Sequence, residues 1–217
     1  TANIAKGPAM TEAQAIQAIE AGIEVVNAEI DKGLDIVGTG DMGIGNTTPS
    51  AAICAVMTGQ SVAKVTGRGT GLSDEQLEHK IRVIEKAIAI NNPDAGDAID
   101  VLTKVGGFEI GGIAGVILGA AARGVPVVID GFISGAAALI AEGLEPQVKE
   151  YIFLGHLSVE PGHRIMAEKL GLKPILTLDL RLGEGTGAAI GIFIAETSAK
   201  ILAEVATFGE AGVSESE

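Results

Sequence analysis

Short, unbroken apolar runs alternate along this chain with longer stretches that carry apolar residues at helical spacing. The clearest run covers residues 125–129 and is followed at once by Asp130 and Gly131. Such a run would place apolar residues on both faces of a strand. It therefore predicts a strand that is covered on both faces, as strands of parallel sheets are. The alternation therefore predicts an α/β fold, a Rossmann-like, mainly parallel sheet with helices on both faces.

The expected elements follow one another in this order along the sequence. Strands are expected at residues 34–37, 125–129, 151–156 and 175–180, and a further short strand at the start of the stretch 62–66. Helices are expected at 11–33, from about 48 onward, at 73–90, twice between 96 and 123, at 133–143, at 160–172 and after 187. Thr11 with Gln14, and Ser73 with Gln76, have the spacing of capping boxes at two helix starts.

Length and composition suit one domain with an aliphatic core. The 217 residues are enough to bury a core without metals or disulfides, and we expect a single large α/β domain over 1–217, with a helical lead-in at 1–33 and a frayed tail at 209–217. There is no Trp, one Tyr and five Phe, so Ala, Val, Ile and Leu must fill the core. The 31 glycines indicate tight turns and close backbone approach.

Several classes of function are disfavoured by charge and residue usage. The net charge is −13 and the Lys and Arg residues are scattered, which argues against nucleic-acid binding. The single Cys54 cannot form an intrachain disulfide and lies in an apolar run, which indicates a core residue. The histidines lack the spacing of a zinc site, so no metal is expected. The apolar stretch 110–122 is too short to cross a bilayer, and the final helix carries charges, so we expect a cytoplasmic protein.

Polar or glycine residues follow four of the expected strands, at 40–46, 130–131, 156–158 and 183–187. The carboxyl ends of parallel strands share one edge of a sheet, where ligands bind in such folds. The segment GDMGIGNTTPS at 40–50 is typical of an anion cradle, because glycines let the backbone approach a phosphate and the next helix offers free N–H groups. Its GxGxxG spacing from Gly38 is a weak signal, and a tight turn without a ligand remains the alternative.

Three side chains leave two interpretations open. Lys80 is either a solvated charge on a helix or a ligand contact. His156, at a strand end, is either a pocket residue or a structural histidine. Glu184 stands in a glycine turn between apolar segments, where loss of water would make it a usable general base near neutral pH. It could equally pair with Arg181 or cap the last helix.

Seven motifs in order resemble the nicotinate-nucleotide:dimethylbenzimidazole phosphoribosyltransferase family. They are GPAMTEAQA, GDMGIGNTTPSAA, GRGTGL, GGFEI, VPVVIDGFIS, SVEPGHR and LRLGEGTGAAI. The resemblance implies transfer of 5-phosphoribose from nicotinate mononucleotide to 5,6-dimethylbenzimidazole, with inversion at the anomeric carbon. The products would be α-ribazole 5′-phosphate and nicotinate, in cobalamin biosynthesis. It also implies a homodimer that needs no metal or other cofactor.

The resemblance implies roles for particular residues as well. Glu184 would be the general base, and Leu182 and Gly183 would contact the aromatic base. The phosphate and ribose would be held by a set of loop and strand-end residues together with one lysine: Gly43, Gly45, Asn46, Thr47, Gly69, Lys80, Gly131 and Ser158. Asp41, which stands where the family usually has Glu, would be the second catalytic residue, with a side chain one methylene shorter.

The resemblance also implies that part of the family's site is absent. Family chains are longer, and the stretch before the matched region supplies a small helical domain and part of the base pocket. Two alternatives therefore stay open. Besides the transfer to 5,6-dimethylbenzimidazole, the chain could be a truncated or divergent nucleotide-binding domain without full catalysis, or a transferase that uses another acceptor base, such as adenine or a phenol.

Overall fold

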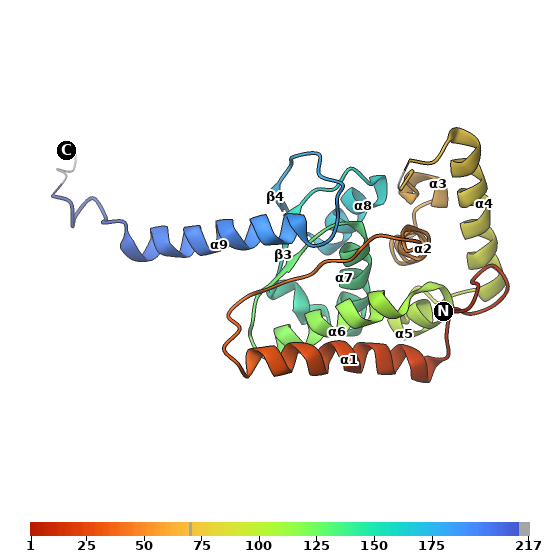
Figure 1. The fold of residues 1–217 in the computed structure, drawn as a ribbon, viewed down its shortest axis with the longest axis horizontal. Coiled ribbons are helices and arrows are strands. Elements are labelled where there is room, and N and C mark those ends of the chain that lie inside the picture. Colours follow the sequence, from red (N-terminus) through yellow and green to blue (C-terminus); the bar gives the residue numbers. More distant parts are fainter. Residues whose placement is uncertain (70, 213–217) are drawn as a thin grey trace.

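The computed structural model describes residues 1–69 and 71–212. Its centre is a sheet of four short parallel strands in the order β1-β2-β3-β4, which follows the chain (Figure 1). Helix α9 packs against all four strands on one face, and α6 and α7 contact β2 from the other. The expected α/β architecture with helices on both faces is confirmed.

The strands are β1 (Val37–Gly38), β2 (Val127–Ile129), β3 (Ile152–His156) and β4 (Pro174–Leu176). Val37 pairs with Val127, Val127 with Ile152, and Leu154 with Pro174, all in parallel register. All three residues of β2 are buried, as an apolar run with no polar side requires.

The helices surround this sheet and extend the core away from it. Their bounds are α1 (Glu12–Ile30), α2 (Thr47–Thr58), α3 (Val62–Val65), α4 (Asp74–Asn91), α5 (Ala98–Val105), α6 (Phe108–Ala122), α7 (Phe132–Leu144), α8 (Pro161–Leu170) and α9 (Thr186–Glu204), with a 3-10 turn η1 (Pro146–Glu150). Both capping boxes form as expected, Thr11 with Gln14 and Ser73 with Gln76. The break between α5 and α6 falls at Gly106 and Gly107, also as expected.

Helices α1 and α6 pack backbone against backbone, which explains part of the glycine content. A side chain at Gly22 would collide with the carbonyl oxygen of Gly112, and one at Gly115 with that of Ile19. Glycine at both positions lets two helices approach more closely than side chains would allow. The buried core is aliphatic, with Ile53, Leu102 and Ile117 among its fully buried side chains.

Two expected strand segments are wrong, and a third, expected at 34–37, overlaps β1 only at Val37. The stretch that begins at Val62 is one helical turn, α3, because residues three apart share a helix face and Val62 and Val65 are both buried there, whereas a strand would point them to opposite sides. Strand β4 ends at Leu176 rather than at residue 180. Asp179 takes a φ of +53°, which ends the extended backbone.

Helix α9 extends beyond the body of the molecule (Figure 1). It is long and apolar enough to cross a membrane by length and composition alone, a test that core helices of soluble proteins also pass, and 17% of its most apolar window is buried. Of the tail expected to fray, residues 209–212 form turns. Residues 213–217 lie outside the described part of the chain.

Candidate active site

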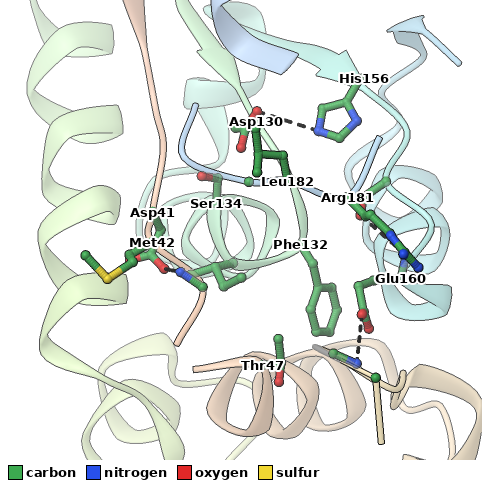
Figure 2. A pocket seen from close by; sticks show the side chains of 17 residues that line it. Asp41, Met42, Thr47, Asp130, Phe132, Ser134, His156, Glu160, Arg181 and Leu182 are labelled. Atoms are coloured by element: carbon green, nitrogen blue, oxygen red, sulfur yellow. Dashed lines mark hydrogen bonds and ion pairs between the residues drawn. The ribbon is translucent and has the colours of Figure 1, made fainter. Parts of the chain in front are cut away.

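A cavity of about 270 Å³ opens beyond the carboxyl ends of β2 and β3 (Figure 2). Asp41 and Met42 lie on one side of it, and Glu160 and Arg181 lie on the other. Most of the site residues predicted from sequence line it: Asp41, Gly43, Thr47, Gly69, Gly131, Ser158, Leu182 and Gly183. The expectation that the strand ends share one edge is thus met.

The first glycine loop is held by Asp41. Its Oδ1 accepts hydrogen bonds from the Gly43 N–H at 2.7 Å and from the Asn46 side chain at 2.5 Å. Asn46 is the N-cap of α2, and within the described residues its side chain makes no capping hydrogen bond to this helix start, the kind of place where anions bind. Gly45 and Asn46 line a neighbouring hollow with Ile44 rather than the main cavity.

Lys80 reaches the cavity wall from α4. Its Nζ donates to Thr47 Oγ1 at 2.8 Å and to the Gly67 carbonyl oxygen at 3.3 Å. Burial lowers the pKa of Lys80, although the nearby Glu160 carboxylate acts to raise it. The interpretation as a freely solvated charge is therefore wrong. A role in phosphate binding stays a prediction.

Glu160 fastens the second glycine loop, which carries Gly67, Gly69 and Gly71, and was missed by the sequence reasoning. Its Oε1 accepts from the Gly69 N–H at 3.1 Å, and its Oε2 is buried against Gly67 without a hydrogen-bond partner in the described part of the chain. The available signal was its place directly before Pro161, the first residue of a helix that follows a strand end.

Asp130 is the second missed residue, although its place at the end of β2 was noted. It accepts from the N–H groups of Gly185 (3.2 Å), Gly187 (2.8 Å) and Ala188 (3.1 Å), and His156 Nε2 lies 3.6 Å away. Burial acts to raise the pKa of Asp130, but His156 and these N–H groups outweigh it and lower the pKa. The carboxylate is therefore ionised at neutral pH.

Glu184 lies in the turn of residues 183–185, called here the Glu184 turn. Its N–H donates to the Asp41 carbonyl oxygen at 2.8 Å. Its side chain is exposed, so the expected loss of water is wrong for the chain as described. Neither structural alternative holds within the described residues: no ion pair with Arg181 forms, and Asp130 caps α9 in its place.

The Glu184 side chain opens onto a hollow beside the main cavity. This hollow is lined by Glu184, Gly40 and Gly185, and it shares Asp41 and Met42 with the cavity. A side-chain carbon at Gly40 would lie 2.6 Å from the Gly185 nitrogen, so the two loops touch through their backbones. The Glu184 turn and the first glycine loop, residues 40–46 and called here the anion loop, thus form one continuous rim.

Two of the three histidines, His156 of β3 and His163 of α8, are buried beside each other. His163 Nδ1 accepts from the Ser158 N–H at 3.0 Å, and burial lowers the pKa of His163 to about 3, so its ring is neutral. His156 lines the cavity and is 2% exposed, which supports the pocket interpretation. The described residues contain no cluster of three His, Cys, Asp or Glu that could hold a metal ion.

Comparison with known proteins decides the family. The model of a phosphoribosyltransferase family matches residues 1–213. The chain belongs to this family. It is 66% identical over 217 residues to the nicotinate-nucleotide–dimethylbenzimidazole phosphoribosyltransferase of Dehalococcoides mccartyi, covering 100% of this chain and 62% of that protein. It is 60% identical over 215 residues to the protein of the same name from Desulforudis audaxviator, covering 99% and 61%.

A solved structure of this phosphoribosyltransferase family agrees with the fold. The crystal structure of CobT from Thermus thermophilus superposes with a TM-score of 0.94 at 44% identity, covering 100% of this chain and 64% of that one. The chain therefore spans less than two thirds of the length of the relatives it matches.

Proposed function

We propose that the protein carrying this chain transfers 5-phosphoribose from nicotinate mononucleotide to 5,6-dimethylbenzimidazole. The products are α-ribazole 5′-phosphate and nicotinate, as in cobalamin biosynthesis. The proposal depends on one observation: the anion loop and the Glu184 turn, which bears a carboxylate, together form the rim of one cavity. The names of relatives at 57–66% identity support this choice of reaction.

The phosphate belongs on the side of α2 and the two glycine loops. Gly43 and Gly69 expose backbone there, Thr47 starts α2, and the Lys80 ammonium lies behind Thr47. A helix N-terminus and a partly desolvated cation both favour a phosphate dianion. Asn46 and Gly45 support the loop from the neighbouring hollow, and Gly131 and Ser158 face the cavity from the strand ends.

The proposed phosphoribosyl transfer requires a general base more than a general acid. The bond between C1′ and the pyridinium nitrogen of nicotinate mononucleotide breaks, and its electron pair stays on that nitrogen. The ring nitrogen of the departing nicotinate is therefore neutral, and the leaving group takes up no proton. One benzimidazole nitrogen attacks C1′ from the opposite face, which inverts the anomeric centre. The other nitrogen gives its proton to Glu184 Oε, and the carboxylate also stabilises the positive charge that grows on the attacking ring.

Asp41 acts mainly on the loop in this scheme. One of its oxygens already holds Gly43 and Asn46, and its carbonyl oxygen holds Glu184. The acceptor ring then lies at Leu182 and Gly183, opposite Met42. The Leu182 and Met42 side chains are 67% and 69% exposed and offer apolar surface to a flat ring.

The exposure of Glu184 favours a second candidate, a chain that binds the nucleotide without completing transfer. We propose instead that parts of the protein beyond this chain cover the Glu184 hollow and finish the base pocket. The protein is further proposed to be a cytoplasmic homodimer without affinity for nucleic acid. The net charge of −13 supports the last point.

A transfer assay separates these functions. The protein is mixed with nicotinate mononucleotide and 5,6-dimethylbenzimidazole, and nicotinate and α-ribazole 5′-phosphate are followed by chromatography. Equal release of both products only when both substrates are present supports the proposal. Nucleotide binding without turnover supports the binding domain, and turnover only with adenine or a phenol supports another acceptor.

A further inference from the structure

Asp130 is a buried carboxylate to which the proposed reaction gives no part. It directly follows β2, faces the cavity and is 2% exposed. A carboxylate removed from water is costly unless hydrogen bonds satisfy it. The groups that satisfy Asp130 therefore indicate why it is there.

Its side chain accepts hydrogen bonds from three N–H groups of the segment that carries Glu184, and His156 Nε2 lies 3.6 Å from Oδ1. Oδ2 accepts from the Gly185 N–H, and Oδ1 accepts from the N–H groups of Gly187 and Ala188. Gly185 stands at the N-cap of α9 and has no side chain to cap it. Asp130 thus supplies the missing cap from a distant part of the sequence, and the positive end of the helix dipole favours its charge.

The Glu184 turn needs such support. Its three residues, Gly183, Glu184 and Gly185, have φ angles of +75°, +58° and +79°. For the two glycines this is inexpensive, but a glutamate in the left-handed region costs about 1 kcal/mol or more. Such a conformation persists only where neighbouring groups hold it, and here the Asp41 carbonyl oxygen holds the Glu184 N–H at 2.8 Å from one side.

We propose that Asp130 is a positioning residue that holds the Glu184 turn from the other side and so fixes the Glu184 carboxylate beside the cavity. The part of the inference that concerns catalysis rests on the proposed function. The part that concerns the conformation of the turn does not. Asp130 links the end of β2 to the start of α9. One side chain therefore sets the position of the Glu184 carboxylate relative to the edge of the sheet.

Asp130→Asn separates the roles of the two carboxylate oxygens, Oδ2 on Gly185 and Oδ1 on Gly187 and Ala188. The amide keeps one acceptor oxygen, which can still cap Gly187 and Ala188, but its NH₂ group replaces the acceptor of the Gly185 N–H. We expect kcat to fall about 10- to 100-fold, because small misplacement of a catalytic group has effects of this size. KM for nicotinate mononucleotide should change much less than kcat, because the turn contacts Gly40 and the Asp41 carbonyl oxygen but not Thr47 or Lys80.

Asp97→Asn is the matched control. Asp97 caps α5 through the N–H groups of Ile99 and Asp100, far from the cavity wall, and should leave kcat unchanged. Asp130→Glu keeps the charge but lengthens the side chain by one methylene, and it should lower kcat in a folded protein. Full activity of either Asp130 variant would overturn the inference.

A double-mutant cycle distinguishes positioning from a general loss of structure. If Asp130 acts through Glu184, Asp130→Asn should have almost no further effect on kcat in a Glu184→Gln background. An equal fold-loss in both backgrounds would overturn the inference. If Glu184→Gln alone retains full kcat, the proposed role of Glu184 fails, and the catalytic part of this inference fails with it.

Hydrogen exchange tests the turn without any assay of activity. The Gly185 amide should exchange at least several-fold faster in Asp130→Asn than in the wild type, whereas amides in α8 should exchange at the same rate. Unchanged exchange at Gly185 would overturn the inference even where transfer activity is intact. Faster exchange in a protein without transfer activity would uphold the inference and reject the proposed function.

Discussion

At the scale of single residues, charged side chains hold the loops of the candidate site. Asp41 and Glu160 each fasten one glycine loop, Asp130 fastens the Glu184 turn, and Lys80 braces Thr47. Glycine-rich backbone approaches a ligand closely but has little stiffness of its own. The carboxylates of Asp41, Glu160 and Asp130 therefore fix the positions of these loops.

Glu184→Gln tests the general base. The amide keeps the shape of the side chain but accepts no proton, so kcat should fall about 100-fold or more, while the dissociation constant for nicotinate mononucleotide stays nearly the same. Turnover by chromatography and binding by calorimetry measure the two effects. Near-normal turnover would remove Glu184 from the role of base.

Lys80→Ala tests the phosphate side. Loss of a charge-assisted contact of about 1.5–3 kcal/mol should weaken nicotinate mononucleotide binding about 10- to 100-fold. Lys86→Ala, an exposed lysine of the same helix, is the control and should bind as the wild type does. Equal affinities of both variants would show that the Lys80 ammonium only supports Thr47 and Gly67.

At the scale of elements, the site depends on two loops that meet through their backbones. Gly40 lies against Gly185, with no room for a side chain between the anion loop and the Glu184 turn. The contact couples the two halves of the rim, so movement of either loop shifts the other.

Gly40→Ala tests this contact. The added carbon would lie 2.6 Å from the Gly185 nitrogen and must push the turn outward, at a cost of about 1–3 kcal/mol in unfolding free energy and with a marked loss of kcat. Gly7→Ala is the control, since nothing lies within 4 Å of its added carbon. Urea denaturation and the transfer assay report the two effects, and wild-type values for Gly40→Ala would contradict the coupling.

The spacing of apolar residues predicted most of the helices and strands, because the residues at that spacing are the ones that are buried. It failed at Val62, where two valines three residues apart suit one helical turn, and at residues 177–180, where an apolar run leaves the sheet. The glycine and strand-end residues of the cavity could be predicted, since parallel strands end at one edge. Asp130 and Glu160 could not be given their roles, because these depend on partners 55 and 91 residues away.

At the scale of the whole molecule, α9 carries apolar side chains that nothing in the described chain covers. Phe193 and Leu202 are 68% and 89% exposed, and the helix extends beyond the sheet it caps (Figure 1). Large exposed apolar surfaces of this kind mark interfaces. The proposed homodimer gives this surface a partner.

Leu202→Glu tests that assignment. A charge within an apolar interface should weaken self-association at least about 10-fold, because the carboxylate loses water without gaining a partner. Sedimentation velocity over a concentration series measures the change, with Lys200→Gln on the same helix as the control. A wild-type protein that stays monomeric, or a variant that dimerises as well as the wild type, contradicts the assignment.

The most direct measurement of the central claim is a crystal structure of the protein with nicotinate mononucleotide bound. The account predicts the phosphate between Gly43, Gly69 and Thr47, with the Lys80 ammonium behind it, and the ribose C1′ turned toward the rim that carries Glu184. A nucleotide seated elsewhere, such as the groove lined by His79 and Leu72, would contradict it. So would a phosphate placed against the Glu184 turn.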